Sequence, residues 1–437
     1  MSLGPTFDLK DLAQSRVNGT TSGIYSVCSA HPWVLEAAMR KIAKSNEPLL
    51  IEATCNQVNQ FGGYTGMTPH SFREFVFSIA ARTGFRQDRI LLGGDHLGPY
   101  PWRHLAASEA MEHAVDLVDA FAQAGFTKIH LDASMACKYD PTPLPDELIA
   151  ARAALLAKTA ENAPDNENLR YVIGTEVPVP GGASEELSVS VTRPSSAEGA
   201  LTLHRAAFTA AGIEYAWARV VALVVQPGVE FGHEDVVDYD RNKAHLLRAM
   251  LEWHPALVFE AHSTDFQRPG AFVELVQDGF AILKVGPALT YAMRQALFAL
   301  LLIEERMVPE QDRSRLDDVL QRAMKENPEH WKDHYKGEAF EIERLRIYSY
   351  SDRIRYYWTL PSVVAATSKL LRNLERSRIP LTLLADYLPI QYTRVRNGEL
   401  DNSPLPLILD KIGEALEPYI RACRGETTFQ ETSLCIQ

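Results

Sequence analysis

The 437-residue sequence lacks several common features, and each absence excludes a class of protein. It has only five cysteines, which are widely spaced and form no CxxC pair, so neither a disulfide framework nor a thiolate zinc site is indicated. No run of about 18 uncharged apolar residues is present, which excludes a transmembrane helix. The first ten residues lack the basic-then-apolar pattern of a signal peptide. We therefore expect a protein of the reducing cytoplasm with no membrane partner.

An excess of positive charge is also missing. Lys and Arg number 44 against 56 Asp and Glu, which gives a net charge of −12. A protein that tracks nucleic-acid phosphates usually carries a basic face, so we expect no nucleic-acid partner. Apolar residues make up 46% and charged residues 23%, the balance of an ordinary globular protein, which excludes a disordered chain.

What the sequence does contain is a regular alternation of short apolar runs and longer segments of helical period. Eight such strand–helix units occur within about 280 residues, the number and size expected of a (β/α)8 TIM barrel. An open doubly wound sheet is the main alternative, but no cofactor-binding glycine fingerprint follows any predicted strand. The predicted strands are 24–28, 49–53, 90–93, 128–131, 171–174, 220–225, 257–259 and 281–285.

The predicted domain organisation is a barrel followed by an extension. Glycines at 84, 125, 212 and 279 lie between a predicted helix and the next strand, where a left-handed cap residue is expected. We predict an N-terminal segment at 1–23, the barrel at 24–305 and a mostly helical C-terminal extension at 306–437, with helices near 313–325, 361–374 and 406–424.

Polar residues at the strand ends predict the site, because catalytic groups of such barrels lie at the carboxyl ends of the strands. His96, Glu176 and His262 form a mixed nitrogen–oxygen set suited to a divalent metal such as zinc or manganese. Such a metal would polarise a carbonyl oxygen and stabilise an enediolate. Asp95 or Glu260 could then move protons.

Other strand ends supply further candidates. Asp132 is a third candidate catalytic carboxylate, whereas His31 and His130 are expected mainly to orient a neighbour. Glycine amides at the strand ends could bind an anion, which suggests a phosphorylated substrate. No GxxxxGK[ST] sequence occurs, so ATP-dependent phosphoryl transfer has no support. The candidate substrate- or phosphate-binding residues are Glu52, Asn56, Gly182, Gln226, Gly228, Ser263, Lys284 and Gly286.

Several of these strand ends belong to long motifs that resemble the GatZ/KbaZ family across nearly the whole chain. Members of this family are known as non-catalytic subunits of tagatose-1,6-bisphosphate aldolase, as tagatose-6-phosphate 4-epimerases, or under the name tagatose 6-phosphate kinase. The resemblance implies a phosphorylated ketohexose as substrate, in galactitol and tagatose catabolism, and a catalytic class II aldolase subunit as a possible partner. The motifs lie at 26–32, 51–54, 56–69, 93–99, 129–135, 171–182, 224–231, 260–265, 282–290 and 351–358.

The family is also similar to catalytic class II aldolases. By that resemblance Asp95 is a proton donor, His96 and His262 are metal ligands, Glu176 lies near the metal, and Ser263 binds phosphate. Two departures count against aldolase catalysis, because position 226 has Gln in place of a metal-binding histidine and position 286 has Gly in place of a substrate-handling asparagine.

Three functions follow from the resemblance, and the first agrees best with the residues. A ketohexose-phosphate 4-epimerase could invert carbon 4 by retro-aldol cleavage and re-addition, which requires an enediolate stabiliser and a proton carrier. An accessory subunit of an aldolase ranks second and a kinase third. A Schiff base on Lys284 is an alternative chemistry, a tagaturonate-type substrate remains open, and so does a homo-oligomer.

Overall fold

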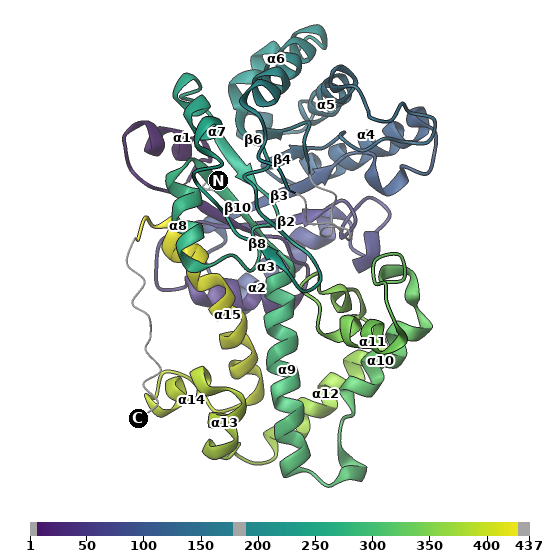
Figure 1. The fold of residues 1–437 in the computed structure, drawn as a ribbon, viewed down its shortest axis with the longest axis vertical. Helices are drawn as coiled ribbons and strands as arrows, with labels where there is room; N and C mark the ends of the chain where they lie inside the picture. The colour runs from purple at the N-terminus through teal and green to yellow at the C-terminus, as the bar shows by residue number, and fades with distance from the viewer. Residues whose placement is uncertain (1–6, 178–188, 427–437) are drawn as a thin grey trace.

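The computed structural model describes residues 7–177 and 189–426, and the fold is a closed barrel of eight parallel strands (Figure 1). The order around the barrel is β1-β10-β9-β6-β5-β4-β3-β2, so each strand pairs with its neighbour along the chain. The predicted (β/α)8 fold is confirmed. The barrel strands are β1 (Ile24–Val27), β2 (Leu49–Thr54), β3 (Ile90–Leu97), β4 (Lys128–Leu131), β5 (Arg170–Ile173), β6 (Val220–Val224), β9 (Val258–Ala261) and β10 (Phe280–Val285).

Helices surround the barrel and follow the strands as the sequence pattern predicts. Most begin with a proline in their first turn, a position where its missing N–H costs nothing. The four predicted cap glycines all have positive φ angles, between 71° and 91°. The surrounding helices are α2 (Pro32–Lys41), α3 (Pro69–Thr83), α4 (Ala107–Gln123), α5 (Asp146–Ala160), α6 (Pro194–Ala210), α7 (His245–Met250), α8 (Pro269–Gln277) and α9 (Pro287–Met307).

The extension is helical, as predicted, and it is joined to the barrel by a continuous helix. The helix α9 starts at the end of β10 and runs out of the barrel into the extension (Figure 1), so the boundary predicted at 305/306 falls within it. The last helix returns to pack against α2, α8 and α9. The extension contains α10 (Leu316–Glu326), α11 (Ala339–Ile347), the 3-10 turn η9 (Arg353–Tyr357), α12 (Pro361–Glu375), α13 (Leu381–Tyr387), α14 (Pro389–Arg396) and α15 (Pro404–Cys423).

Three features differ from the sequence-based expectation. A helix α1 (Lys10–Val17) lies within the predicted N-terminal segment, and its Leu12 packs with residues from the starts of the strands, such as Leu50 and Val258. A two-stranded hairpin, β7 (Glu230–Phe231) and β8 (Val236–Val237), follows β6. The helix that follows β6 and this hairpin is short, because α7 ends at Met250 and continues as a 3-10 turn.

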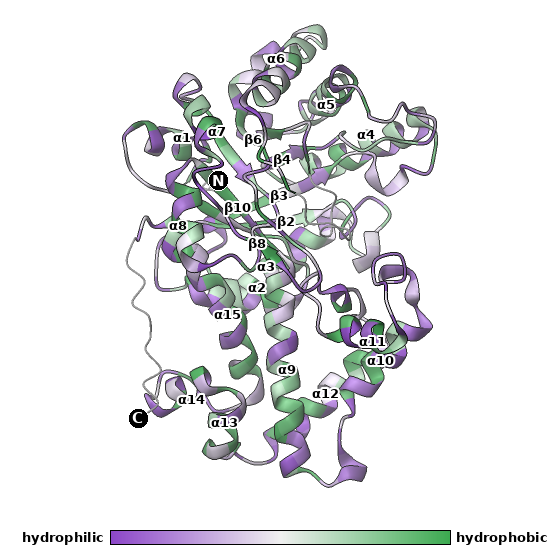
Figure 2. Ribbon diagram, in the orientation of Figure 1, coloured by the Kyte–Doolittle hydropathy of each residue, from purple (hydrophilic) through white to green (hydrophobic). Residues whose placement is uncertain are grey.

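The strands are buried almost throughout, as expected for a parallel sheet covered by helices. Figure 2 colours the chain by hydropathy and shows hydrophobic residues in these strands. The interior of the barrel is nevertheless not purely apolar. Glu52, Lys128, Glu260 and Lys284 are all at most 5% exposed and come from four different strands. TIM barrels are usually filled with branched aliphatic side chains, so this charged layer requires a local explanation.

Candidate active site

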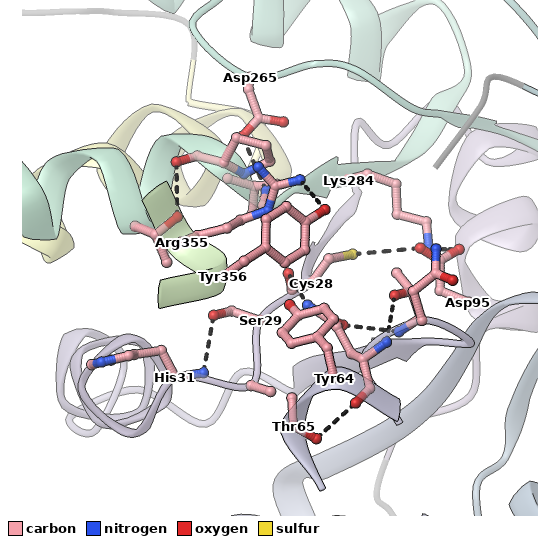
Figure 3. A pocket seen from close by; sticks show the side chains of 18 of the residues that line it. Cys28, Ser29, His31, Tyr64, Thr65, Asp95, Asp265, Lys284, Arg355 and Tyr356 are labelled. Atoms are coloured by element: carbon pink, nitrogen blue, oxygen red, sulfur yellow. Dashed lines mark hydrogen bonds and ion pairs between the residues drawn. The ribbon is translucent and has the colours of Figure 1, made fainter. Parts of the chain in front are cut away.

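A pocket opens where the barrel strands end, and it is lined by residues from both the barrel and the extension (Figure 3). Asp95 and His96 reach it from β3, His262 follows β9, and Lys284 comes from β10. Arg355 of the extension forms part of its wall. This is the end of the barrel at which the sequence predicts the site.

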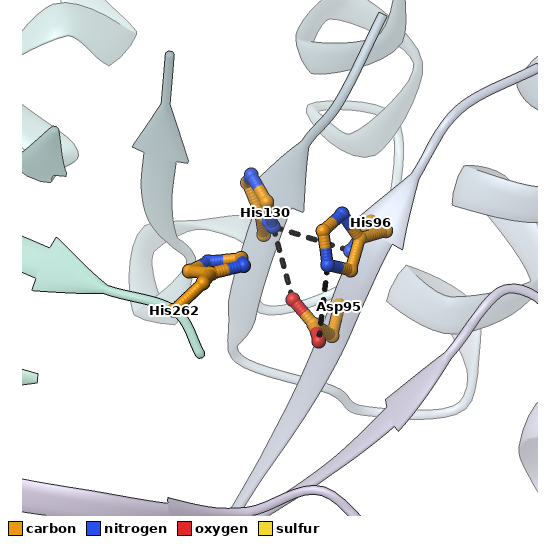
Figure 4. Close-up of side chains that lie close together, drawn as sticks. All are labelled: Asp95, His96, His130 and His262. Carbon is orange, nitrogen blue, oxygen red and sulfur yellow. Dashed lines mark hydrogen bonds and ion pairs between the residues drawn. The ribbon is translucent and has the colours of Figure 1, made fainter. Parts of the chain in front are cut away.

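Three imidazoles and one carboxylate lie close together here (Figure 4): His96, His262 and Asp95 line the pocket, and His130 is buried beside them. The ring centroids of His96, His130 and His262 lie 4.9 to 5.2 Å from one another. One ligand atom from each of these histidines and one from Asp95 all lie within 4.8 Å of each other, and all four residues are buried. Such a group can hold a divalent metal ion.

Each imidazole is held by a carboxylate. His96 Nδ1 lies 2.7 Å from Asp132 Oδ2, and His262 Nε2 lies 2.9 Å from Glu260 Oε1. His130 Nδ1 lies 3.0 Å from Asp95 Oδ1. Carboxylates in this position orient metal-ligating imidazoles and raise their basicity.

The local backbone explains how adjacent residues of β3 both reach the site. In a regular strand Asp95 and His96 would point to opposite faces, but the register of the β3–β4 pairing shifts between Gly94 and Leu97. His96 also has a positive φ of 50°, as does Ser263 with 53°, which is unusual for non-glycine residues. Strained backbone of this kind concentrates at functional sites.

A glycine in β3 makes room for the charged layer. A Cβ atom on Gly93 would lie 2.7 Å from Glu52 Cγ, so any other residue there would displace the Glu52 side chain. Glu52 is fully buried and accepts a hydrogen bond from Ser26 Oγ at 2.6 Å.

Two lysines pair with the buried carboxylates below the imidazoles. Lys128 Nζ lies 2.8 Å from both Glu52 Oε1 and Glu260 Oε2. Lys284 Nζ contacts Glu52 and lies 2.7 Å from Asp95 Oδ1. A buried charge is costly unless it is paired in this way.

The donor set fits a divalent cation on two counts. His130 Nε2 is buried and has no hydrogen-bond partner, and an orphaned imidazole nitrogen among other imidazoles is a suitable metal ligand. The formal charges point the same way. With the three imidazoles neutral, as metal ligands are, the carboxylates of Glu52, Asp95, Asp132 and Glu260 outnumber the two lysines by two, which a divalent ion would balance.

The titration behaviour of the site follows from these contacts. Burial alone would raise the pKa of Asp95, but the nearby charges of His96 and Lys284 outweigh it and hold that pKa well below its usual range. Burial lowers the pKa of His262 to about 3, so its ring is neutral, the form that binds metals. Burial also disfavours the charged form of Lys284, but Asp95, Glu260 and Glu52 raise its pKa well above the ordinary value. A protonated lysine is not a nucleophile, which counts against the Schiff-base alternative.

The structure does not bring all the predicted residues together. Glu176 is exposed, its carboxylate accepts a hydrogen bond from Thr192 Oγ1, and it is not part of the imidazole cluster. His130, which the sequence suggested mainly as an orienting residue, occupies the third position instead. Gly182 lies outside the described residues. Asp132 and Glu260 lie behind the imidazoles that they orient.

The predicted substrate-binding residues divide into two groups. Asn56, Ser263, Lys284 and Gly286 line the pocket. Gln226 and Gly228 do not line it, and Glu52 lies in the charged layer among the lysines. Further residues line the pocket that were not predicted as site residues, although they lie within the family motifs; they include Tyr64, Asp265 and Arg355.

The closed eight-stranded barrel makes this a TIM-barrel protein. Its candidate metal centre lies at the carboxyl ends of the strands, where TIM-barrel enzymes have their active sites. Comparison with known protein families confirms the resemblance to the GatZ/KbaZ family that the sequence predicts. The chain belongs to the family described as D-tagatose-1,6-bisphosphate aldolase subunit GatZ/KbaZ-like, which matches residues 9–424.

Solved structures give a similar result. A probable tagatose 6 phosphate kinase from Sinorhizobium meliloti 1021 is 51% identical, with a TM-score of 0.86, over 92% of this chain and 100% of that chain. The YdjI aldolase from Escherichia coli K12 is 12% identical, with a TM-score of 0.41, over 84% of this chain and 96% of that chain. The fructose-bisphosphate aldolase from Campylobacter jejuni is also 12% identical, with a TM-score of 0.46, over 85% of this chain and 94% of that chain.

Proposed function

We propose that the protein is a ketohexose-phosphate 4-epimerase that interconverts tagatose 6-phosphate and fructose 6-phosphate, in galactitol and tagatose catabolism. The observation that carries this proposal is the cluster of three imidazoles and Asp95 at the mouth of the barrel. It is supported by membership of a family described by its link to tagatose bisphosphate.

The chemistry that inverts carbon 4 is cleavage and re-formation of the C3–C4 bond. Carbon 4 is beta to the ketone, so its hydrogen is not acidic. If a base takes the proton of the C4 hydroxyl, the C3–C4 electron pair moves to C3 and C2 and gives an enediolate, while C4 becomes an aldehyde. The aldehyde then turns, C3 attacks its other face, and the new C4 oxygen takes the proton back.

The side chains of the site suit the separate parts of this reaction. A zinc- or manganese-like ion held by His96, His130 and His262 would supply Lewis-acid polarisation of the ketose carbonyl. The Asp95 carboxylate lines the pocket, where it would accept the hydroxyl proton and return it. Lys284, protonated beside Asp95, helps to keep the Asp95 carboxylate ionised.

The test is incubation of purified protein with tagatose 6-phosphate without ATP, followed by carbon NMR of the sugar. We expect fructose 6-phosphate to form with added Zn²⁺ or Mn²⁺ and its formation to stop with chelator. Unchanged sugar under all conditions would refute the epimerase, and conversion only with ATP would indicate a kinase.

An accessory role beside a catalytic class II aldolase is the second candidate. The family description names an aldolase subunit. The position that would carry a metal-binding histidine in an aldolase is Gln226, whose Oε1 instead accepts hydrogen bonds from the amides of Gly228 and Val229. Co-purification with an aldolase, together with no activity alone, would favour this candidate.

The cellular location stays a prediction. The structure holds no helix long and apolar enough to cross a membrane within its described residues. The four cysteines in the described part of the chain are all free. We propose a cytoplasmic protein, as the cysteine usage predicts.

A further inference from the structure

The extension contributes a positively charged group to the pocket wall. Arg355 lies on the 3-10 turn η9 (Arg353–Tyr357), and Arg355, Tyr356 and Thr359 all line the pocket that contains His96 and His262 (Figure 3). The rings of Tyr356 and Tyr64 meet edge to face at 4.9 Å, which joins this turn to the loop that follows β2.

The Arg355 guanidinium is held in place but is not neutralised by an ion pair. Its Nη1 donates to the carbonyls of Ser351 and Asp352, and its Nη2 donates to Tyr356 Oη at 2.9 Å. Its Cζ atom lies 4.5 Å from the centre of the Tyr356 ring. Among the residues that the structure describes, Arg355 forms no ion pair within 4.0 Å, and the carboxylates that interact with its charge, Asp265 and Asp352, are farther away.

Lys284, which also lines the pocket, is already paired with carboxylates. Lys284 Nζ contacts carboxylates of Glu52, Asp95 and Glu260, at the floor of the site. A second anion bound there would have to compete with three buried carboxylates. Among the described residues that line the pocket, Arg355 is therefore a cation that can meet an anionic ligand.

Backbone amides that were expected to bind phosphate donate instead to side-chain oxygens of the protein. The amides of Gly286 and Ala288, at the start of α9, donate to Asp265 Oδ1 at 3.0 and 2.8 Å. The Gly228 amide donates to Gln226 Oε1 at 2.8 Å. Within the described residues, the chain thus fills with its own oxygens two places where strand-end amides would otherwise hold a phosphate.

We propose that Arg355 binds the phosphate group of the sugar phosphate, so that the extension takes part in selecting a phosphorylated substrate. The planar guanidinium, fixed by two carbonyls and a tyrosine, is suited to a phosphate because it offers parallel N–H donors. This inference rests on the proposed function for the identity of the sugar, but not for the presence of a phosphate-binding group.

The test compares binding of tagatose 6-phosphate, tagatose and inorganic phosphate to the full chain by isothermal titration calorimetry. The variants are Arg355→Met, which removes the charge, and Arg355→Lys, which keeps the charge but lacks the parallel N–H donors of the guanidinium group. Arg103→Met is the matched control, because Arg103 also lies over a tyrosine ring, at 4.2 Å from Tyr100, but does not line the pocket.

We expect Arg355→Met to weaken binding of tagatose 6-phosphate and of phosphate at least tenfold, and to leave tagatose binding within twofold. Arg355→Lys should be intermediate, and Arg103→Met should match the unaltered protein. Equal losses for both sugars would overturn the proposal and indicate a structural role. Unchanged binding in Arg355→Met, or no binding of either phosphorylated ligand by the unaltered protein, would overturn it too. Because these are binding measurements, tight Arg355-dependent binding without conversion would reject only the epimerase.

Discussion

The metal-binding role of His130 can be tested by a substitution that removes one ring nitrogen and keeps the other. His130 Nδ1 contacts Asp95 and the His96 amide, whereas Nε2 is buried without a partner. Asparagine places its amide near the position of Nδ1 and has nothing at the position of Nε2. The variant His130→Asn therefore removes the candidate ligand atom while it preserves the local hydrogen bonding.

The expected loss follows from the number of ligands. Residues that merely orient a metal ligand typically account for 10- to 100-fold in affinity. Loss of one of three imidazole ligands should therefore weaken zinc binding by at least about 100-fold, or about 2.7 kcal/mol. The control is Glu176→Gln, because the Glu176 side chain is exposed and hydrogen bonded to Thr192 instead. We expect this control to change the affinity by less than about twofold.

The assay is competition for Zn²⁺ against a chromophoric chelator, with the metal content checked by mass spectrometry. His130→Asn with unchanged zinc affinity would refute the assignment of His130 as a ligand. If Glu176→Gln instead lost the metal, the ligand set predicted from the sequence would be the correct one.

Three further predictions concern the groups around the cluster. Asp132→Asn should lower metal affinity about 10- to 100-fold, because Asp132 orients the His96 ring; an unchanged affinity in the chelator competition would contradict this role. Lys128→Met should reduce the free energy of unfolding, measured by urea titration, by about 3–5 kcal/mol, because it removes a partner of two buried carboxylates. Lys138→Met, at an exposed position, should have little effect, and equal effects of the two variants would contradict the reasoning. Burial raises the pKa of Asp352 to about 7, so between about pH 4 and pH 7 the folded state holds a proton that the unfolded state has lost. The contribution of Asp352 to the free energy of unfolding should therefore fall as the pH rises through this range, by at most about 1.4 kcal/mol per pH unit. Asp352→Asn should flatten this part of the stability profile, and an unaltered profile would show that Asp352 does not titrate there.

The barrel could be predicted because its strands are short, apolar and separated by helices of regular period. The hairpin β7–β8 could not, since its strands have two residues each and show no alternation. The helices α13 (Leu381–Tyr387) and α14 (Pro389–Arg396) were also missed, because each spans about two turns and buries only one residue.

The site was only partly predictable for a related reason. Asp95, His96 and His262 follow from the rule that barrel sites gather at strand ends. The rule does not say which way a side chain points beyond the strand, and Glu176, three residues after the end of β5, is exposed. His130 lies inside β4, so its direction depends on the pleat and on the shifted register with β3. Arg355 is remote in sequence, and only the packing of the extension brings it to the pocket.

The most direct test of the proposed chemistry is conversion of tagatose 6-phosphate in D₂O, followed by proton and carbon NMR of the product. Cleavage and re-formation of the C3–C4 bond never removes the hydrogen from carbon 4. We therefore predict that the metal-loaded protein forms fructose 6-phosphate that retains protium at C4. The Asp95→Asn variant should form no fructose 6-phosphate. Product that carries deuterium at C4, or no product from the metal-loaded protein, would contradict the account.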